Sequence, residues 1–347
     1  MFRSILCFLG LVLALPLVAF MPLAFRLPLT ISGVGYLFGA ILTVSGLILA
    51  PKVVQYYVLT ISGILIVVVI ASIRLFLVRN TDLSLKVITL PSAGKTSSIN
   101  RLIDEQDNLV FGEALFHKIG GDSDREHEGL TSAFVDVYSK MRKEGSFSSP
   151  ILSTYLNLQT PSHFDAVVIE PDGEAHFGLV FLHGYMGNVA AQCWVIAQAV
   201  KQLGGVTVCP STVWTGAWWE PDGQRILQNT LKYLRGQGIT TIYLGGFSNG
   251  GFSIGRLASE LKNERELSGL IFIDGFMNGE MIRSLGLPVL IIEGTQDTRV
   301  PVAAAHQFVT EVGDLGTYEE VNSDHFLIMK QPAMVQNAIL RWLEKYR

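Results

Sequence analysis

Hydrophobic residues are distributed unevenly along the chain, and the first 79 residues are far more apolar than the rest. Three uncharged stretches follow one another there, over residues 4–25, 27–51 and 53–73. Each is long enough to cross about 30 Å of hydrocarbon as a helix of about 20 residues. Because a backbone in lipid must satisfy its own hydrogen bonds, we expect transmembrane helices. Residues 1–79 are therefore predicted to be an integral membrane segment with two or three spans.

The number of spans depends on the first stretch, which also has features of a signal peptide because Arg3 precedes its apolar run. It is long for that role, contains Pro16 and Pro22, and lacks a clear small-residue cleavage site. Small residues in the other two stretches would allow close helix contact, although membrane helices are rich in them generally. They are Gly33, Gly35, Gly39, Ser45, Gly46, Ser62 and Gly63.

Flanking charges give an expected orientation. In a three-span arrangement, one side of the membrane receives Arg26, Arg74, Arg79 and Lys86, and the other receives Arg3 and Lys52. The positive-inside rule then predicts that the C-terminal part of the chain lies in the cytosol.

From residue 164 onward, short apolar runs alternate with segments of helical periodicity that often end at glycine. The runs predicted to be strands are FDAVVIEP, HFGLVFLHG, GVTVCPS, TTIYLGGF, LSGLIFIDGF, LPVLIIEGTQD and GTYEEVNS. This alternation is typical of an α/β fold with a doubly wound, mostly parallel sheet. Such sheets bind ligands at the carboxyl ends of their strands.

The intervening region is more polar. Residues 80–98 have the pattern of a linker or short strand, and residues 99–118 and 131–145 have helical patterns. The predicted organisation is a membrane segment over 1–79, a linking helical segment over 80–163 and a C-terminal domain over 164–347.

Composition narrows the classes of function. Among 347 residues, 16% are charged and the net charge is −4, so nothing indicates nucleic-acid binding. The cysteines Cys7, Cys193 and Cys209 have no metal-site spacing, and we expect no disulfide framework. No metal or cofactor is predicted.

The candidate chemistry begins at Ser248, in the stretch YLGGFSNGGFS. Gly246 and Gly250 flank it in the order strand, Gly-x-Ser-x-Gly, helix, which is the arrangement of a nucleophile elbow. A serine hydroxyl is a weak nucleophile until a base removes its proton. Histidine suits that role because its pKa lies near neutrality.

A base and a carboxylate follow Ser248 in the required order. Asp297 comes after one predicted strand and His325 after the next, so both lie at the same sheet edge as the serine. His183 is an alternative base and Asp274 an alternative acid, and the sequence favours His325 and Asp297 over them. Asp324, beside His325, is expected to be solvated.

With these elements in order, residues 164–347 closely resemble the α/β-hydrolase superfamily. The segment LHGYMGN stands where that family has its oxyanion loop. The resemblance implies that the backbone N–H groups of Tyr185 and Asn249 stabilise a developing oxyanion. It also implies a Ser-His-Asp triad that works through an acyl-enzyme.

Two features concern the substrate. Only GFMNGEMIRSLG separates two late strands, which leaves no room for the cap that many family members insert there, so residues 99–163 are a candidate lid. Trp214, Trp218 and Trp219 follow a strand near the expected site. They would line an acyl pocket, lie at a lipid interface or simply pack within their loop.

The sequence therefore predicts a membrane-anchored serine hydrolase of carboxylic esters, with a lipid-like or acylated substrate. A peptidase, thioesterase or acyltransferase with the same triad is an alternative, because the chemistry up to the acyl-enzyme is shared. A non-catalytic membrane scaffold with a hydrolase fold is another, since a fold alone does not fix a function.

Overall fold

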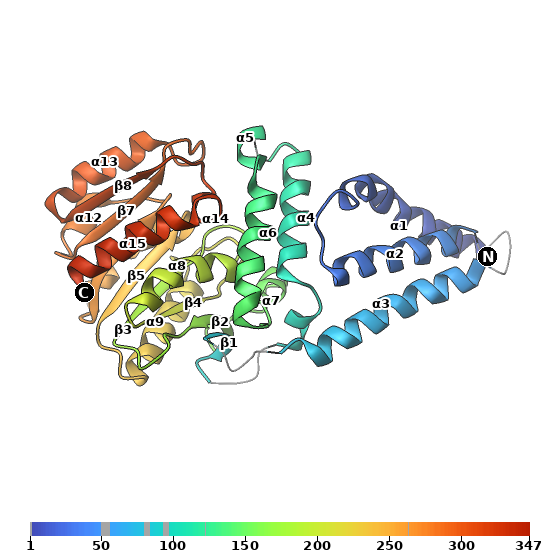
Figure 1. The fold of residues 1–347 in the computed structure, drawn as a ribbon, viewed down its shortest axis with the longest axis horizontal. Helices are drawn as coiled ribbons and strands as arrows, with labels where there is room; N and C mark the ends of the chain where they lie inside the picture. The colour runs from blue at the N-terminus through green and yellow to red at the C-terminus, as the bar shows by residue number, and fades with distance from the viewer. Residues whose placement is uncertain (1, 50–55, 80–83, 93–96, 122, 263) are drawn as a thin grey trace. The chain divides into compact units, whose positions relative to one another are not determined.

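The computed structural model describes residues 2–49, 56–79, 84–92, 97–121, 123–262 and 264–347. The chain forms two compact units (Figure 1). The helical unit comprises Met1–Arg79 and Arg101–His127, and the sheet unit comprises Asn80–Asn100 and Glu128–Arg347. This division differs from the predicted one, because residues 101–127 group with the N-terminal helices.

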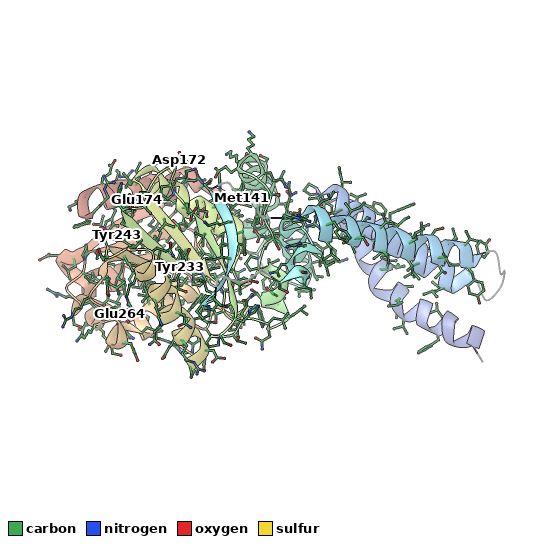
Figure 2. All side chains as sticks on the ribbon, turned by 90° about the horizontal axis from the view of Figure 1, so that it is seen from below. Met141, Asp172, Glu174, Tyr233, Tyr243 and Glu264 are labelled. Atoms are coloured by element: carbon green, nitrogen blue, oxygen red, sulfur yellow. A yellow bond between two sulfur atoms is a disulfide. The ribbon has the colours of Figure 1, made fainter. Side chains whose placement is uncertain are left out.

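The helical unit consists of α1 (Phe2–Ala24), α2 (Ile31–Leu49), α3 (Tyr57–Leu77), α4 (Glu105–Lys118) and α5 (Asp124–His127). Within the described residues, α2 and α3 are long and apolar enough to cross a membrane. Their side chains project outward along both helices (Figure 2), and many large apolar ones are exposed. The orientation argument also uses Lys52 and the side chain of Arg3, which lie outside the described part of the structure.

Small residues mediate the contact between α2 and α3. A Cβ atom at Gly63 would lie 2.5 Å from the Gly39 carbonyl oxygen, and one at Gly46 would lie 2.4 Å from the Thr60 nitrogen. A larger side chain at either glycine would separate the helices. Close helix contact, rather than general composition, therefore explains Gly39, Gly46 and Gly63.

The sheet unit contains an eight-stranded sheet in the order β1-β2-β4-β3-β5-β6-β7-β8. Its strands are β1 (Leu85–Leu90), β2 (Phe164–Ile169), β3 (Phe177–Leu182), β4 (Gly205–Pro210), β5 (Ile242–Phe247), β6 (Leu267–Ile273), β7 (Val289–Gly294) and β8 (Gly316–Val321). β2 pairs antiparallel with β1 and β4, and the other pairings are parallel. The predicted α/β class and mostly parallel sheet are confirmed.

Helices cover both faces of the sheet (Figure 1). On one face, α8 (Ala190–Gln202) packs against β2 and β4, and α15 (Pro332–Tyr346) packs against β7 and β8. The other face is covered by α9 (Pro221–Gly236), α10 (Asn249–Arg256) and α13 (Val302–Val312), which join its apolar core. Strands buried on both faces read as near-continuous apolar runs, which is why they could be found in the sequence.

Shorter elements complete the sheet unit. They are α6 (Leu130–Met141), α7 (Ile151–Tyr155), α11 (Ala258–Leu261), α12 (Gly279–Arg283) and α14 (Leu327–Lys330), with 3-10 turns at Arg142–Glu144 and Gly313–Leu315 and one spanning the unit boundary at Ser98–Arg101. The connection from β6 to β7 holds only α12, so it contains no cap.

A buried carboxylate fixes part of the predicted linking segment to the sheet. Asp165 in β2 accepts hydrogen bonds from Thr89 at 3.0 Å, Asn100 at 2.8 Å and Ser153 at 3.0 Å. Its own N–H donates to Gln159 Oε1 at 2.8 Å. These contacts explain why β1 and the segment around α7 belong to the sheet unit and not to a separate linker.

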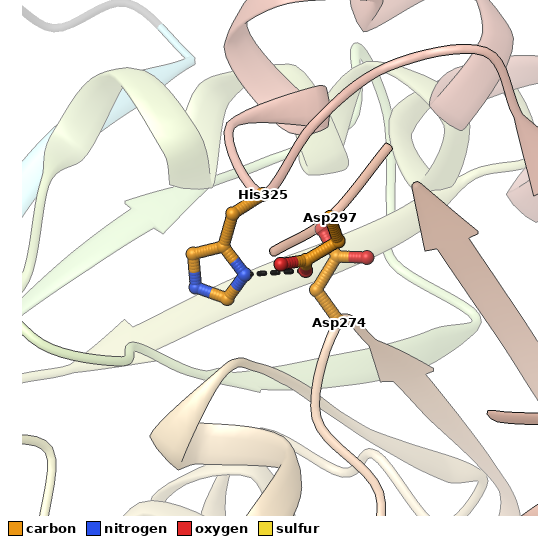
Figure 3. A group of neighbouring side chains, drawn as sticks. All are labelled: Asp274, Asp297 and His325. Atoms are coloured by element: carbon orange, nitrogen blue, oxygen red, sulfur yellow. Dashed lines mark hydrogen bonds and ion pairs between the residues drawn. The ribbon is translucent and has the colours of Figure 1, made fainter. Parts of the chain in front are cut away.

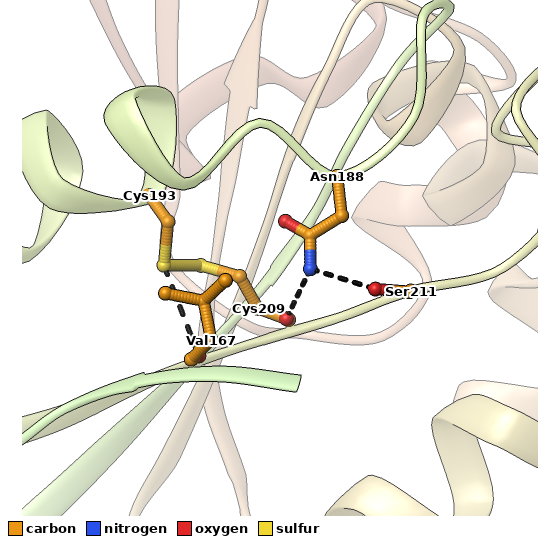
Figure 4. Close-up of a disulfide and its surroundings, with 5 residues drawn as sticks. All are labelled: Val167, Asn188, Cys193, Cys209 and Ser211. Carbon is orange, nitrogen blue, oxygen red and sulfur yellow. Dashed lines mark hydrogen bonds between the residues drawn. A yellow bond between two sulfur atoms is a disulfide. The ribbon is translucent and has the colours of Figure 1, made fainter. Parts of the chain in front are cut away.

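The expectation of no disulfide is wrong. Cys193 in α8 and Cys209 in β4 are bonded, with their Cα atoms 6.1 Å apart (Figure 4). The two residues are separated by 16 positions, and the crossover that packs α8 against β4 brings them together. Sequence spacing gave no signal for this contact because it depends on how the helix lies on the sheet.

Candidate active site

Ser248 lies in a strained turn between β5 and α10. Its φ of 52° and ψ of −119° are unusual for a residue with a side chain. A Cβ atom at Gly250 would lie 2.0 Å from the Leu182 carbonyl oxygen, and one at Gly246 would lie 2.4 Å from the Gly250 carbonyl carbon. Both flanking glycines are therefore required for the close approach of strand and helix, as in a nucleophile elbow.

Ser248, His325 and Asp297 form a continuous hydrogen-bonded line. His325 Nε2 lies 3.0 Å from Ser248 Oγ. On the other side of the ring, His325 Nδ1 lies 2.6 Å from Asp297 Oδ2 (Figure 3). The other oxygen of Asp297 accepts the backbone N–H groups of Arg299 at 2.7 Å and Val300 at 2.9 Å. The structure thus brings together the three residues predicted as the triad.

Before the reaction, this line is oriented for proton transfer from Ser248 to His325. Because Asp297 is a carboxylate acceptor, Nδ1 of His325 carries the imidazole proton and Nε2 is free to accept one from Ser248. The imidazolium that forms is stabilised by the same carboxylate, whose own position is fixed by its two backbone donors. The His325 ring also lies 5.0 Å from the Phe247 ring, centroid to centroid, which restricts its orientation.

Next to Ser248, the loop after β3 approaches the elbow closely. A Cβ atom at Gly184 would lie 2.9 Å from Ser248 Cβ. Among the described residues, no group accepts the backbone N–H of Tyr185 or of Asn249. The side chain of Asn249 donates instead to the Thr215 carbonyl at 2.8 Å, which leaves its backbone as the relevant group. Two such donors beside a nucleophile have the character of an oxyanion hole.

His183, the alternative base, is engaged at both ring nitrogens. Nδ1 lies 2.8 Å from the Gly184 carbonyl oxygen, and Nε2 accepts the Thr212 N–H at 3.2 Å. Burial lowers the pKa of His183 to about 4. The ring is therefore neutral, and it joins the oxyanion loop to the loop after β4.

Asp324, expected to be solvated, is instead buried. Its carboxylate pairs with Lys330 at 2.6 Å and accepts the Phe326 N–H at 3.0 Å. That pairing directs it away from His325 and stabilises the turn into α14.

The three tryptophans of the loop after β4 have different environments. Trp218 is 0% exposed and donates to the His183 carbonyl, so the expectation that it lines a pocket is wrong. Trp219 lies under the Arg256 guanidinium, 4.2 Å from ring centroid to Cζ. Trp214 is 45% exposed and meets the ring of Tyr185, itself 55% exposed, edge to face at 4.9 Å. Sequence position alone did not separate these environments.

A second pair of acids lies behind the triad. Asp274, the alternative acid, follows β6 and donates its own N–H to Ile292 in β7. Glu293, at the end of β7, is fully buried and was not predicted as a functional residue. The only sequence signal was a carboxylate within the apolar run VLIIEG. Asp274, Asp297 and His325 place ligand atoms within 4.8 Å of one another. A metal bound by Nδ1 of His325 would take the place of the proton that lies between this nitrogen and Asp297.

The sheet order, the elbow after β5, the acid after β7 and the histidine after β8 together define the α/β-hydrolase fold. No family model and no curated protein sequence matches the chain. Solved structures similar to this chain include proteins described as esterases and serine hydrolases.

Est1E from Butyrivibrio proteoclasticus is 15% identical with a TM-score of 0.46, over 53% of this chain and 94% of that one. The esterase domain of a Rhodothermus marinus protein is also 15% identical, with a TM-score of 0.45 over 53% and 94%. An alpha-beta serine hydrolase homologue from Coxiella burnetii is 18% identical, with a TM-score of 0.41 over 52% and 91%.

Proposed function

We propose that this chain is a membrane-anchored serine hydrolase that cleaves carboxylic esters. The observation that carries the proposal is the hydrogen-bonded line from Ser248 through His325 to Asp297, with Ser248 on a strained elbow. Strained backbone conformations cluster at active sites, so the elbow favours catalysis over the alternative of a non-catalytic scaffold.

In the proposed reaction, Ser248 Oγ attacks the acyl carbon while His325 Nε2 takes the hydroxyl proton. The N–H groups of Tyr185 and Asn249 hold the negative charge that develops on the carbonyl oxygen. His325 then gives its proton to the departing alkoxide, which leaves as the alcohol and yields the acyl-enzyme. Water then attacks this ester while His325 takes a proton from it, and His325 gives that proton to Ser248 Oγ as the acid is released.

Two features support an apolar substrate near a membrane. The exposed rings of Tyr185 and Trp214 belong to the loops that border Ser248, and such a pair offers an apolar rim with polar edges. Helices α2 and α3 are apolar and largely unburied, as expected for lipid-facing spans. We therefore propose an acyl ester of lipid-like character as substrate.

Part of the candidate lid lies at this rim. A Cβ atom at Gly187 would lie 2.8 Å from Cγ2 of Thr154 in α7, so α7 borders the oxyanion loop. Replacing Leu156, which follows α7 and is 50% exposed, by serine should change the preference for acyl chain length. An unchanged chain-length profile would contradict a lid role.

Labelling with a fluorophosphonate probe tests the nucleophile. We expect labelling of the full chain and none of Ser248→Ala, with turnover reduced by a factor of about 10⁴ to 10⁶. Ser259→Ala, an exposed serine, is the matched control and should label normally. A panel of esters, thioesters and aminoacyl amides then separates an esterase from a thioesterase or peptidase. Absence of Ser248-dependent labelling and of turnover across the panel would refute the proposal.

A further inference from the structure

Two buried carboxyl groups beside the triad take no part in the proposed reaction. Asp274 follows β6 and Glu293 lies in β7, and both are 0% exposed. Asp274 Oδ1 accepts the Gly294 N–H at 2.9 Å. Figure 3 shows Asp274 next to Asp297, on the side of Asp297 away from the His325 ring. The complete burial of two carboxyl groups next to the triad requires an explanation.

A hydrogen bond between the carboxyl groups of Asp274 and Glu293 requires a proton on one of them. Among the described residues, no donor reaches Asp274 Oδ2 or either oxygen of Glu293. Asp274 and Glu293 are neighbours across the sheet, because Ile273 pairs with Ile292 and the N–H of Asp274 donates to the Ile292 carbonyl. Ionised carboxylates are acceptors only, so the two groups form a hydrogen bond with each other only when one of them is protonated.

The surroundings oppose ionisation of both groups. Burial raises the pKa of Asp274 well above its usual range, and the charges of Glu293 and Asp297 raise it further. Burial likewise raises the pKa of Glu293 to about 8, with the hydrogen bond to Asp274 opposing and Asp297 and Glu320 adding to it. The titratable groups that face the pair from the neighbouring strands and loops are Asp297, Tyr318, Glu320 and His325.

We infer that Asp274 and Glu293 share one proton and act as positioning residues for Asp297. Their hydrogen bond joins the end of β6 to the end of β7, immediately before the turn that carries Asp297. The same end of β6 accepts the Ser248 N–H through the Ile273 carbonyl at 2.9 Å. The pair therefore lies between the nucleophile elbow and the acid loop.

Loss of the shared proton has a defined consequence. Two adjacent carboxylates then repel each other and Asp297, and the bond between β6 and β7 is lost. Asp297 is then held less firmly against His325, so we expect activity to fall as the pH rises. This consequence for activity rests on the proposed hydrolase function.

The pH profile of kcat/KM with an aryl ester tests the inference. For the unmodified chain we expect kcat/KM to fall on the alkaline side as the pair loses its shared proton. In Glu293→Gln the amide donates to Asp274 at every pH, so the alkaline limb should move upward by about one unit or more. Glu293→Ala should lower kcat/KM across the range, without the recovery that Gln provides.

Glu174→Gln is the matched control, because Glu174 is exposed to solvent and is not among the titratable groups that face the pair. The same change of carboxyl to amide there should leave the alkaline limb within about half a unit, because exposed charges are screened.

Thermal stability gives a readout that needs no activity. A carboxyl whose pKa is raised on folding binds a proton in the folded state that the unfolded chain releases. Stability should therefore fall as pH rises from the ordinary glutamate value of about 4.3 towards about 8. The Tm of the unmodified chain should fall more steeply over that window than the Tm of Glu293→Gln.

If Glu293→Gln matches the unmodified chain in both the alkaline limb and the slope of Tm, the inference is overturned. If no variant turns over any ester but the slope of Tm is flattened in Glu293→Gln, the hydrolase proposal fails and the shared proton is supported.

Discussion

Replacing Asp297 by asparagine gives the sharpest prediction about the triad, because the structure fixes which way the amide must face. Oδ1 of Asp297 accepts two backbone N–H groups, from Arg299 and Val300. In Asp297→Asn only the amide oxygen can fill that role, so the NH₂ group is turned towards His325. Nδ1 of His325 must then accept a proton rather than donate one, and the ring proton moves to Nε2. Nε2–H faces Ser248 and cannot act as its base.

The expected loss in kcat is that of a triad whose residues stay in place but whose histidine can no longer act as a base. Loss of the correct tautomer in such a triad costs a factor of about 10⁴ in kcat, which corresponds to about 5.4 kcal/mol in the activation free energy. The fold should change little, because the backbone hydrogen bonds and the side-chain volume are retained.

The assay is kcat/KM for an aryl ester together with the rate of fluorophosphonate labelling, with Tm measured in parallel. Asp222→Asn makes the same chemical change at an exposed carboxylate and should leave both rates unchanged. A folded Asp297→Asn variant that loses less than about tenfold in rate would show that the tautomer is not set by this contact.

Four further predictions test the fold and the rim. Gly250→Ala should prevent correct folding of the elbow, because its Cβ would lie 2.0 Å from the Leu182 oxygen. Gly236→Ala is the control, because nothing lies within 4 Å of the added Cβ, and measurements of Tm should show that only the second variant is tolerated. Asp165→Ala should lower the free energy of unfolding by about 3–5 kcal/mol in denaturant titrations, since it strands three buried donors, while Asp172→Ala at a 90% exposed side chain should change it little. Trp214→Ala should reduce turnover of long-chain or aryl esters about tenfold relative to acetate, and Trp219→Ala should not alter that ratio. Denaturation followed by alkylation without reductant should leave Cys193 and Cys209 unmodified, and modification of both would show that the disulfide is absent.

The alternation of strands and helices after residue 164 was predictable because each strand is buried on both faces and each crossover helix has one apolar face. The positions of Ser248, Asp297 and His325 at one edge of the sheet could be predicted from the same alternation. Each residue follows a predicted strand, and parallel strands end at one edge of the sheet. β1 was ambiguous in the sequence because a short edge strand differs little from an extended linker.

The features that were missed depend on tertiary contacts between segments distant in sequence. Trp214, Trp218 and Trp219 share one loop and one residue type, and only the path of the backbone decides that Trp218 points into the core. Asp324 was expected to be solvated because its partner, Lys330, is reached only after the chain turns into α14. Glu293 lies in a strand that is otherwise apolar, and the partner that explains it, Asp274, comes from the neighbouring strand.

Two features of the chain make opposite predictions about the compartment of the sheet unit. The basic residues that flank the third apolar stretch favour the cytosol. The Cys193–Cys209 disulfide favours an oxidising compartment, because disulfides seldom persist in the cytosol. Basic flanks bias insertion statistically, whereas a disulfide that persists in the native protein reflects the redox compartment of the sheet unit itself. Alkylation of freshly isolated membranes would show whether Cys193 and Cys209 are bonded in the native protein. That result has more weight than the flanking charges in assigning the side of the membrane on which the sheet unit and its proposed substrate lie.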